Sequence, residues 1–229
     1  MIDWHSHILP SVDDGSQSPE ESLKLLKMEA EQGVDLVIAT PHFYAEEESP
    51  EHFLERRKNA FLSLQKQMDA DLPKILLGAE VRYYPGISQM QNIKALCIEG
   101  TSLLLLEMPF SDWREYTVRE VLKLAHSGDI TVILAHVERY LPFQNKDVWK
   151  RFAESGIFMQ ANASFFLQFS TKRKALYLLQ NAQIRLIGSD CHHTISRPPR
   201  MGEAFDVIRK KFGEEFVFQM QEYGYSLLH

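Results

Sequence analysis

The sequence has no run of about 18 consecutive apolar residues, the length that a membrane-spanning helix requires. It also has no basic N-terminal region followed by an apolar stretch, so no secretory signal peptide is predicted. Cysteine is scarce: Cys97 and Cys191 are the only two, and they lie far apart. This usage is typical of free thiols in a reducing compartment. We therefore expect a soluble, cytoplasmic protein that does not insert into a membrane.

Dense basic tracts and glycine-rich phosphate loops are also missing. The 25 lysines and arginines are outnumbered by 31 acidic residues, and this net charge of -6 argues against nucleic acid as a partner. Cys191 stands between Asp190 and His192, but the Cys-x5-Arg pattern of a phosphate-binding loop does not follow it. We expect the thiol to point away from its two neighbours and to play no part in chemistry.

Short apolar runs alternate with amphipathic segments along the whole chain, a pattern that predicts parallel strands separated by helices. The predicted strands are residues 1–4, 36–40, 75–81, 102–107, 130–136, 157–160 and 184–188. The predicted helices are residues 18–33, 50–68, 87–96, 115–126, 146–155, 172–181, 199–211 and 214–222. Strict alternation favours a seven-stranded (β/α) barrel of the α/β class over a doubly wound sheet. Since no repeat or linker divides the chain, we expect one domain over residues 1–229.

The first strand ends in two histidines, His5 and His7. Side chains at i and i+2 of a strand point to the same side, so these imidazoles project together. Imidazole is the commonest metal ligand in proteins. Asp14 follows in a turn beside Gly15, where a carboxylate can bend back toward them. The pair and the turn together indicate part of a metal site.

Further ionisable side chains stand at the ends of the later strands, and barrel enzymes gather their chemistry at these carboxyl ends. Each has an innocuous alternative as a helix start or a packed core residue. Their repeated position after buried apolar runs makes coincidence improbable, because buried ionisable groups are normally paired or bound to metal. The candidate ligands are His5, His7, Asp14, His42, Glu80, Glu107, His136, Asp190 and His192.

Nine ligands exceed the needs of one ion and suit a cluster of two or three, with a carboxylate between neighbours. Mixed imidazole and carboxylate ligands, with no thiolate required, point to Mn, Fe, Zn or Mg. Arg139 and Arg197 lie on loops that leave ligand-bearing strands, where a guanidinium fork can hold phosphate oxygens. A surface salt bridge is the alternative for either arginine.

Several spaced motifs together resemble a known family. They are His5-Ser6-His7, Val12-Asp13-Asp14-Gly15, Gly78-Ala79-Glu80, His136-Val137-Glu138-Arg139-Tyr140 and Asp190-x-His192 with Ser196-Arg197-Pro198-Pro199. They look like the polymerase-and-histidinol-phosphatase (PHP) superfamily, and are most similar to its capsule-operon branch of manganese-dependent tyrosine-protein phosphatases.

The resemblance implies a distorted seven-stranded barrel with three metals. His5, His7, Glu80 and Asp190 would hold the first metal. Glu80, Glu107 and His136 would hold the second, and Asp14, His42 and His192 the third. Arg139 and Arg197 would bind the phosphate, and hydroxide would attack phosphorus without a phosphocysteine intermediate. The implied substrate is a phosphotyrosine protein such as a capsule-synthesis tyrosine kinase, and the oligomeric state stays open.

Two other readings compete with this one. A small-molecule phosphatase, acting on histidinol phosphate or nucleotides, would share the metal site. The aromatic residues Phe43, Tyr44, Phe110 and Trp113 bear on this choice, because they either flank a flat leaving group or pack within their loops. A catalytically silent, metal-stabilised module that binds a kinase is the third reading, and the complete ligand set argues against it.

Overall fold

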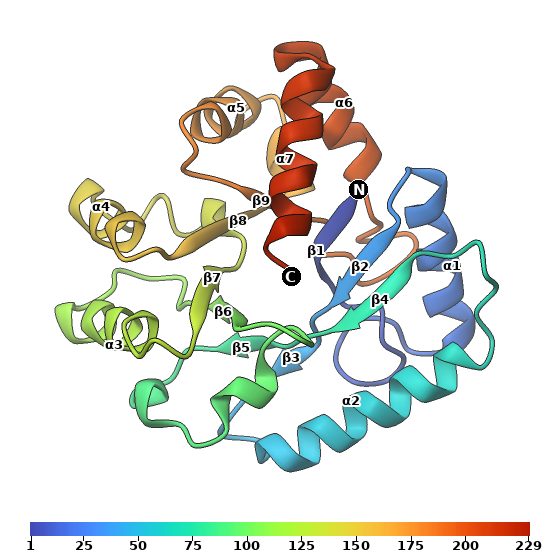
Figure 1. Cartoon of the computed structure of the whole chain (residues 1–229), viewed down its shortest axis with the longest axis horizontal. Helices are drawn as coiled ribbons and strands as arrows, with labels where there is room; N and C mark the ends of the chain where they lie inside the picture. The colour runs from blue at the N-terminus through green and yellow to red at the C-terminus, as the bar shows by residue number, and fades with distance from the viewer.

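A curled parallel β-sheet forms the centre of the computed structural model, which describes residues 1–229 (Figure 1). Every ladder in it is parallel. The strands are β1 (Ile2–Ser6), β2 (Leu36–Ala39), β3 (His42–Phe43), β4 (Lys74–Leu77), β5 (Glu80–Arg82), β6 (Leu103–Glu107), β7 (Thr131–Leu134), β8 (Phe158–Asn162) and β9 (Leu186–Gly188).

The strands follow one another round a ring. Hydrogen bonding gives the orders β1-β2-β4 and β3-β5-β6-β7-β8-β9. Since β3 continues the path of β2 and β5 that of β4, the nine pieces occupy the seven predicted strand positions. A single bridge between Ser6 and Cys191 brings β1 beside β9. The predicted distorted seven-stranded barrel is confirmed. The contact between β1 and the β9 segment, which we call the seam, has the fewest paired residues of any two neighbouring strands.

Helices surround the sheet (Figure 1). They are α1 (Pro19–Glu31), α2 (Pro50–Gln65), α3 (Glu115–Ala125), α4 (Lys146–Glu154), α5 (Lys172–Gln180), α6 (Met201–Phe212) and α7 (Glu214–Ser226). The start of α1 follows from its sequence, because Ser18 accepts a hydrogen bond from the Glu21 amide and Pro19 occupies the first turn. None of the helices is both long and apolar enough to cross a bilayer.

Two predicted elements were wrong. The expected strand 75–81 is interrupted at Gly78-Ala79, where the buried Arg57 of α2 donates to the Gly78 carbonyl oxygen at 2.6 Å. The expected helix 87–96 consists of two 3-10 turns, Ile87–Gln89 and Ile93–Leu96, separated by Asn92 with a φ of 62°. The other predicted elements are present, with ends that differ by a few residues.

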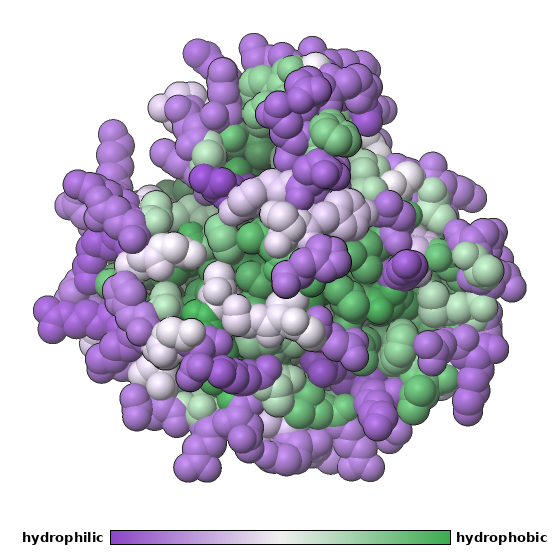
Figure 2. Space-filling model, in the orientation of Figure 1, coloured by the Kyte–Doolittle hydropathy of each residue, from purple (hydrophilic) through white to green (hydrophobic).

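The buried apolar side chains form two clusters. The larger one contains 50 residues and includes the inward faces of the helices. The smaller one contains ten residues, mostly from the strands. Tyr225, near the end of α7, and Leu227 and Leu228, which follow this helix, pack against it. Its members are Ile2, Trp4, Leu36, Ile38, Ile98, Leu103, Leu105, Ile133, Ala135 and Leu186. Figure 2, in the orientation of Figure 1, shows hydrophobic residues in the middle of the visible face and mostly hydrophilic ones at its rim. The C-terminal segment thus closes one end of the barrel, and the site lies at the other.

Candidate metal centre

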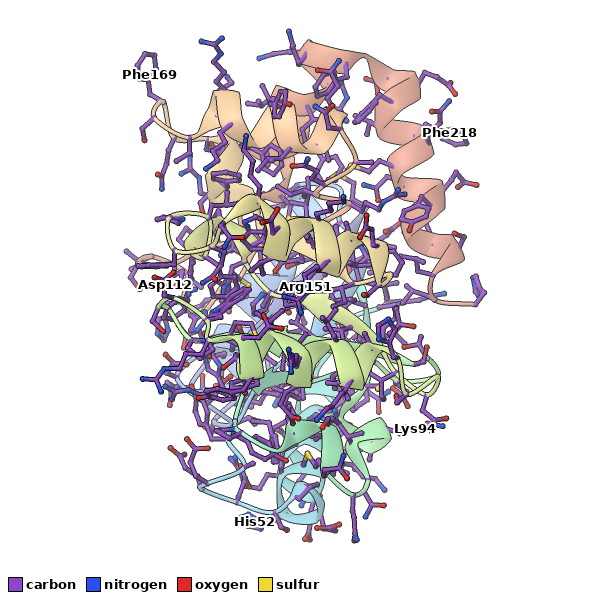
Figure 3. All side chains as sticks on the ribbon, turned by 90° about the vertical axis from the view of Figure 1, so that its left-hand side faces the viewer. His52, Lys94, Asp112, Arg151, Phe169 and Phe218 are labelled. Atoms are coloured by element: carbon purple, nitrogen blue, oxygen red, sulfur yellow. The ribbon has the colours of Figure 1, made fainter.

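The candidate ligands meet at the carboxyl ends of the strands. In Figure 3, Asp112 and Phe169, from the loops after β6 and β8, extend from one side of the molecule, and Lys94 and Phe218 from the opposite side. Loops that follow parallel strands mark the carboxyl ends, so the first side carries the site. All nine candidate ligands are brought together there.

His5 of β1 and His7, which directly follows this strand, face each other and two carboxylates. Their Nε2 atoms lie 3.1 Å apart. An oxygen of Glu80 lies 3.2 Å from His5 Nε2 and 3.4 Å from His7 Nε2. Asp190 Oδ1 lies 3.7 Å and 3.5 Å from the same two nitrogens. The predicted same-side projection of the two histidines is confirmed.

Glu80 occupies the middle of the cluster because two neighbouring strand paths are interrupted side by side. The breaks between β2 and β3 and between β4 and β5 place His42 and Glu80 opposite each other in register. Glu80 Oε2 lies 3.0 Å from His42 Nδ1, and Glu80 Oε1 lies 2.8 Å from His136 Nε2. Glu107, at the end of β6, approaches His136 Nε2 at 3.5 Å.

Asp14 and His192 complete the outer edge of the cluster. Asp14 Oδ1 lies 3.5 Å from both His42 Nε2 and His192 Nε2. The Asp14 side chain is 72% exposed, unlike the other candidate ligands, so a cation held there would face solvent. The turn at Gly15 allows this approach, since a Cβ at that position would lie 2.2 Å from the His7 carbonyl oxygen.

Three histidines are oriented as metal ligands are. The Nδ1 atoms of His5, His7 and His192 contact Gln160 Oε1, Asp13 Oδ2 and the Asp190 carbonyl oxygen at 3.3, 2.7 and 3.1 Å. A ring N–H donated outward leaves the Nε2 lone pair directed into the cluster. The Nε2 atoms of His5 and His7 also face each other, an arrangement that a cation between them would stabilise. The donor set therefore fits metal ions.

The charges of the cluster support the same conclusion. Burial alone would raise the pKa of Glu80 and Asp190, but the imidazoles beside them hold both values well below the ordinary range. Burial lowers the pKa of His136, yet Glu107 and Glu80 raise it to about 9. Burial and the charges of His7 and Arg197 lower the pKa of His192 to about 3. Several anionic oxygens are thus balanced by imidazolium protons, whose place cations can take.

Both candidate phosphate-binding arginines converge on one oxygen. Arg139 donates to Asp190 Oδ2 at 2.7 Å, Arg197 donates to the same atom, and so does the Asn162 amide at 2.7 Å. Asp190 and His136 adopt positive φ values of 54° and 30°. Non-glycine residues in this region are uncommon and gather at functional sites.

A cleft of about 250 Å³ opens beside these groups. Tyr44 and Phe110 line it, whereas Phe43 is buried against Phe53 at 5.2 Å and Trp113 packs on Tyr140 at 5.2 Å. Of the four aromatics considered from the sequence, two therefore flank the cleft and two belong to the core.

Sequence reasoning missed four residues of the site. Asp13, Gln160 and Asn162 orient ligands through hydrogen bonds, and Arg82 lines the cleft with its guanidinium 5.4 Å from the Tyr44 ring. Only Asp13, next to a predicted ligand, carried a signal in the sequence. Cys191 behaves as expected: its thiol is buried, lies 4.0 Å from Glu29, and has a pKa raised well above the usual range by burial.

Known proteins resemble the whole chain. The family described as "Capsular polysaccharide synthesis, CpsB/CapC" matches residues 1–223. The tyrosine-protein phosphatase CpsB of Streptococcus pneumoniae is 32% identical over 93% of this chain and 91% of its own length. The tyrosine-protein phosphatase YwqE of Bacillus subtilis is 30% identical over 100% of this chain and 91% of its own length.

Solved structures agree with the sequence relatives. A chain from crystal structures of YwqE from B. subtilis and CpsB from S. pneumoniae, described as metal-dependent tyrosine phosphatases, matches with a TM-score of 0.85 at 27% identity, covering 100% of this chain and 94% of that one. Histidinol phosphate phosphatase from Lactococcus lactis matches with a TM-score of 0.59 at 13% identity over 92% and 93% of the two chains, a likeness of fold alone. The resemblance found in the spaced motifs is thereby confirmed, and the chain belongs to the CpsB/CapC family of capsular polysaccharide synthesis proteins, on a PHP-type fold.

Proposed function

We propose that this protein is a metal-dependent phosphatase that removes phosphate from phosphotyrosine in proteins and acts in capsular polysaccharide synthesis. The observation that carries the proposal is the convergence of nine imidazole and carboxylate side chains, with Glu80 in their middle, beside a cleft that Arg82, Arg139 and Arg197 line. The family membership and the activities printed for CpsB and YwqE support it. We propose that residues 1–229 act as one domain.

The ligand assignment is part of the proposal. His5, His7, Glu80 and Asp190 would hold one ion; Glu80, Glu107 and His136 a second; Asp14, His42 and His192 a third. The compact groups in the structure support most of this division, although His7 also approaches the third set and His42 also lies with Glu80 and Glu107. Manganese suits this mixed nitrogen and oxygen set. Bound cations would lower the pKa of a coordinated water and neutralise phosphate oxygens.

The protein's own side chains would position the substrate. Arg139 and Arg197 each use one Nη2 donor on Asp190, so other guanidinium N–H groups remain for the phosphate oxygens. Tyr44 and Phe110 would flank the tyrosyl ring. Arg139 lies 5.6 Å from the Phe110 ring, which restrains the guanidinium at the cleft. No step needs a protein nucleophile, in agreement with the buried, protonated Cys191.

Turnover of para-nitrophenyl phosphate with added Mn²⁺ tests the proposal. We expect His136→Ala to lower kcat by about 100-fold or more, since even the loss of an outer-shell partner of a metal costs about 10- to 100-fold. The exposed His126 at the end of α3 provides a matched control, and His126→Ala should keep the wild-type rate. Metal-loaded protein that leaves the compound intact would refute the enzymatic role.

A second experiment addresses the substrate. We expect kcat/KM for a phosphotyrosine peptide from a capsule-synthesis tyrosine kinase to exceed that for histidinol phosphate, because the cleft offers two aromatic rings at an open surface. The reverse order would favour a small-molecule phosphatase with the same metal site.

A further inference from the structure

A β-bulge in β1 determines where His5 points. Asp3 pairs with Val37 and Ser6 with Ala39, so β1 has one residue more than β2 between these two pairs. A bulge of this kind turns consecutive side chains toward the same face and re-aims one of them. Trp4 accordingly joins the small apolar cluster of the barrel, and the next residue, His5, reaches Glu80.

Asp3 supplies the hydrogen bonds that the bulge would otherwise lack. Its Oδ1 atom accepts from the His5 amide at 3.2 Å and from the Ser189 amide at 2.7 Å. Its Oδ2 atom accepts from Ser189 Oγ at 2.5 Å. The carboxylate is fully buried, and unpaired it would be costly to bury. Its three donors come from β1 and from the segment after β9.

Ser189 extends the contact to the metal ligands on the far side of the seam. Its Oγ also accepts from the Cys191 amide at 3.1 Å, which holds the backbone directly after Asp190. The Ser189 amide, which donates to Asp3, holds the backbone directly before Asp190. The Asp190 amide in turn donates to the His5 carbonyl oxygen at 2.7 Å. These contacts stand where β1 and β9 have only a single ladder bridge.

We propose that Asp3, acting through Ser189, is a positioning residue that holds the β1 bulge against the β9 segment and so fixes His5, His7 and Asp190 at the spacing a cation requires. The inference rests on the proposed metal centre. Asp3 itself touches neither the cleft nor the phosphate site. It acts on the backbone of the residues that do, across the seam where the sheet gives the least support.

Metal affinity, measured apart from catalysis, tests this role. We expect Asp3→Asn to weaken Mn²⁺ binding by about 10- to 100-fold, the usual effect of losing an outer-shell partner. Ser189→Ala should also weaken Mn²⁺ binding, but by a smaller factor, because the Ser189 amide still donates to Asp3. Titration calorimetry gives the dissociation constants, and circular dichroism of the metal-free variants shows whether they are folded.

Glu29→Gln is the matched control. Glu29 is as deeply buried beside Asp3, and burial together with the charge of Asp3 raises its pKa well above the ordinary value, so glutamine replaces a protonated acid of the same shape. Its carboxyl group lies beside the side chains of Asp3 and Ser189 but makes no hydrogen bond to the backbone of β1 or of the β9 segment, so we expect wild-type Mn²⁺ affinity.

The outcomes separate the possibilities. Folded Asp3→Asn protein with wild-type affinity would overturn the proposal, as would equal losses in Asp3→Asn and Glu29→Gln. If Asp3→Asn does not fold, the Mn²⁺ affinity of Ser189→Ala tests the proposal instead, and an unchanged affinity in that variant refutes the positioning role. Wild-type protein that binds Mn²⁺ but has no phosphatase activity would refute the proposed function and leave this inference standing.

Discussion

At the scale of single residues, Arg139 and Arg197 offer the most direct test of phosphate binding. Both guanidinium groups meet Asp190 Oδ2, which fixes their positions at the cleft. Lysine keeps the charge but loses the planar fork. We expect Arg139→Lys or Arg197→Lys to lower kcat/KM for a phosphotyrosine peptide by roughly 10- to 100-fold, the effect of losing one charge-assisted hydrogen bond.

Arg151 provides the control for these arginine variants. It makes a two-point contact with Glu115 on α3, at 2.8 and 3.0 Å, and does not line the cleft. Arg151→Lys should therefore keep the wild-type kcat/KM. If the two cleft variants also keep it, the arginines are structural partners of Asp190 and do not bind phosphate.

The titration of His136 predicts how metal binding depends on pH. Although burial lowers the pKa of His136, Glu107 and Glu80 raise it to about 9, so the metal-free ring is protonated at neutral pH. A cation must displace this proton, hence Mn²⁺ affinity should rise with pH up to that value and protons should be released on binding. Calorimetry in two buffers of different ionisation enthalpy measures the release. Identical heats in both buffers would contradict the prediction.

Residues that end apolar runs could be identified from the sequence alone. Val132-Ile133-Leu134-Ala135 delivers His136 from a buried strand, and such a position is costly for an ionisable group without a partner. Gln160 and Asn162 gave no such signal, because amides are ordinary in strands and their role depends on contacts with His5 and Asp190. Arg82 was missed because its place at the cleft depends on the break before β5.

At the scale of elements, the errors of prediction have physical causes. The apolar residues Ile87, Met90, Ile93 and Leu96 recur every three positions, which matches the period of a 3-10 helix better than 3.6. The apolar run 75–81 gave no sign of its interruption, since the break depends on Arg57 from a separate helix. Long-range contacts of this kind are not visible in local patterns.

The packing of β9 on β1 predicts a cost for any side chain at Gly188. A Cβ there would lie 2.5 Å from His5 Cβ and 2.8 Å from His5 N, so the two strands would have to separate. We expect Gly188→Ala to lower the free energy of unfolding by about 1–3 kcal/mol, as overpacking does. Because the displaced residue is a proposed metal ligand, Mn²⁺ should raise the melting temperature of the variant less than that of the wild type.

Gly224 allows the same substitution in a tolerant place next to β1. A Cβ there would meet Ile2 Cδ1 at 3.4 Å, an ordinary contact, within helix α7. Gly224→Ala should raise the free energy of unfolding by up to about 1 kcal/mol through helix propensity. Differential scanning calorimetry of Gly188→Ala and Gly224→Ala compares their stabilities. Equal stability of the two would contradict the tight seam between β1 and β9.

At the scale of the whole molecule, the two free thiols report where the fold opens. Cys97 lies in the large apolar cluster, and burial raises its pKa to about 11. Burial also raises the pKa of Cys191 well above its usual range. Neither thiol should react with a disulfide reagent at pH 8 until the protein opens, because the thiolate is the reactive form.

The two thiols should respond differently to metal. Cys191 stands between Asp190 and His192, so the segment that carries it cannot open while those residues hold a cation. Cys97 instead follows the 3-10 turn Ile93–Leu96, away from the candidate metal ligands. Ligands that bind only the closed form slow opening of the segments they touch. We therefore expect Mn²⁺ to slow the labelling of Cys191 more than that of Cys97, as measured by mass spectrometry of the labelled peptides over time. Equal slowing at both sites would mean that only global unfolding exposes Cys191, and the seam between β1 and β9 would then be as stable as the rest of the barrel.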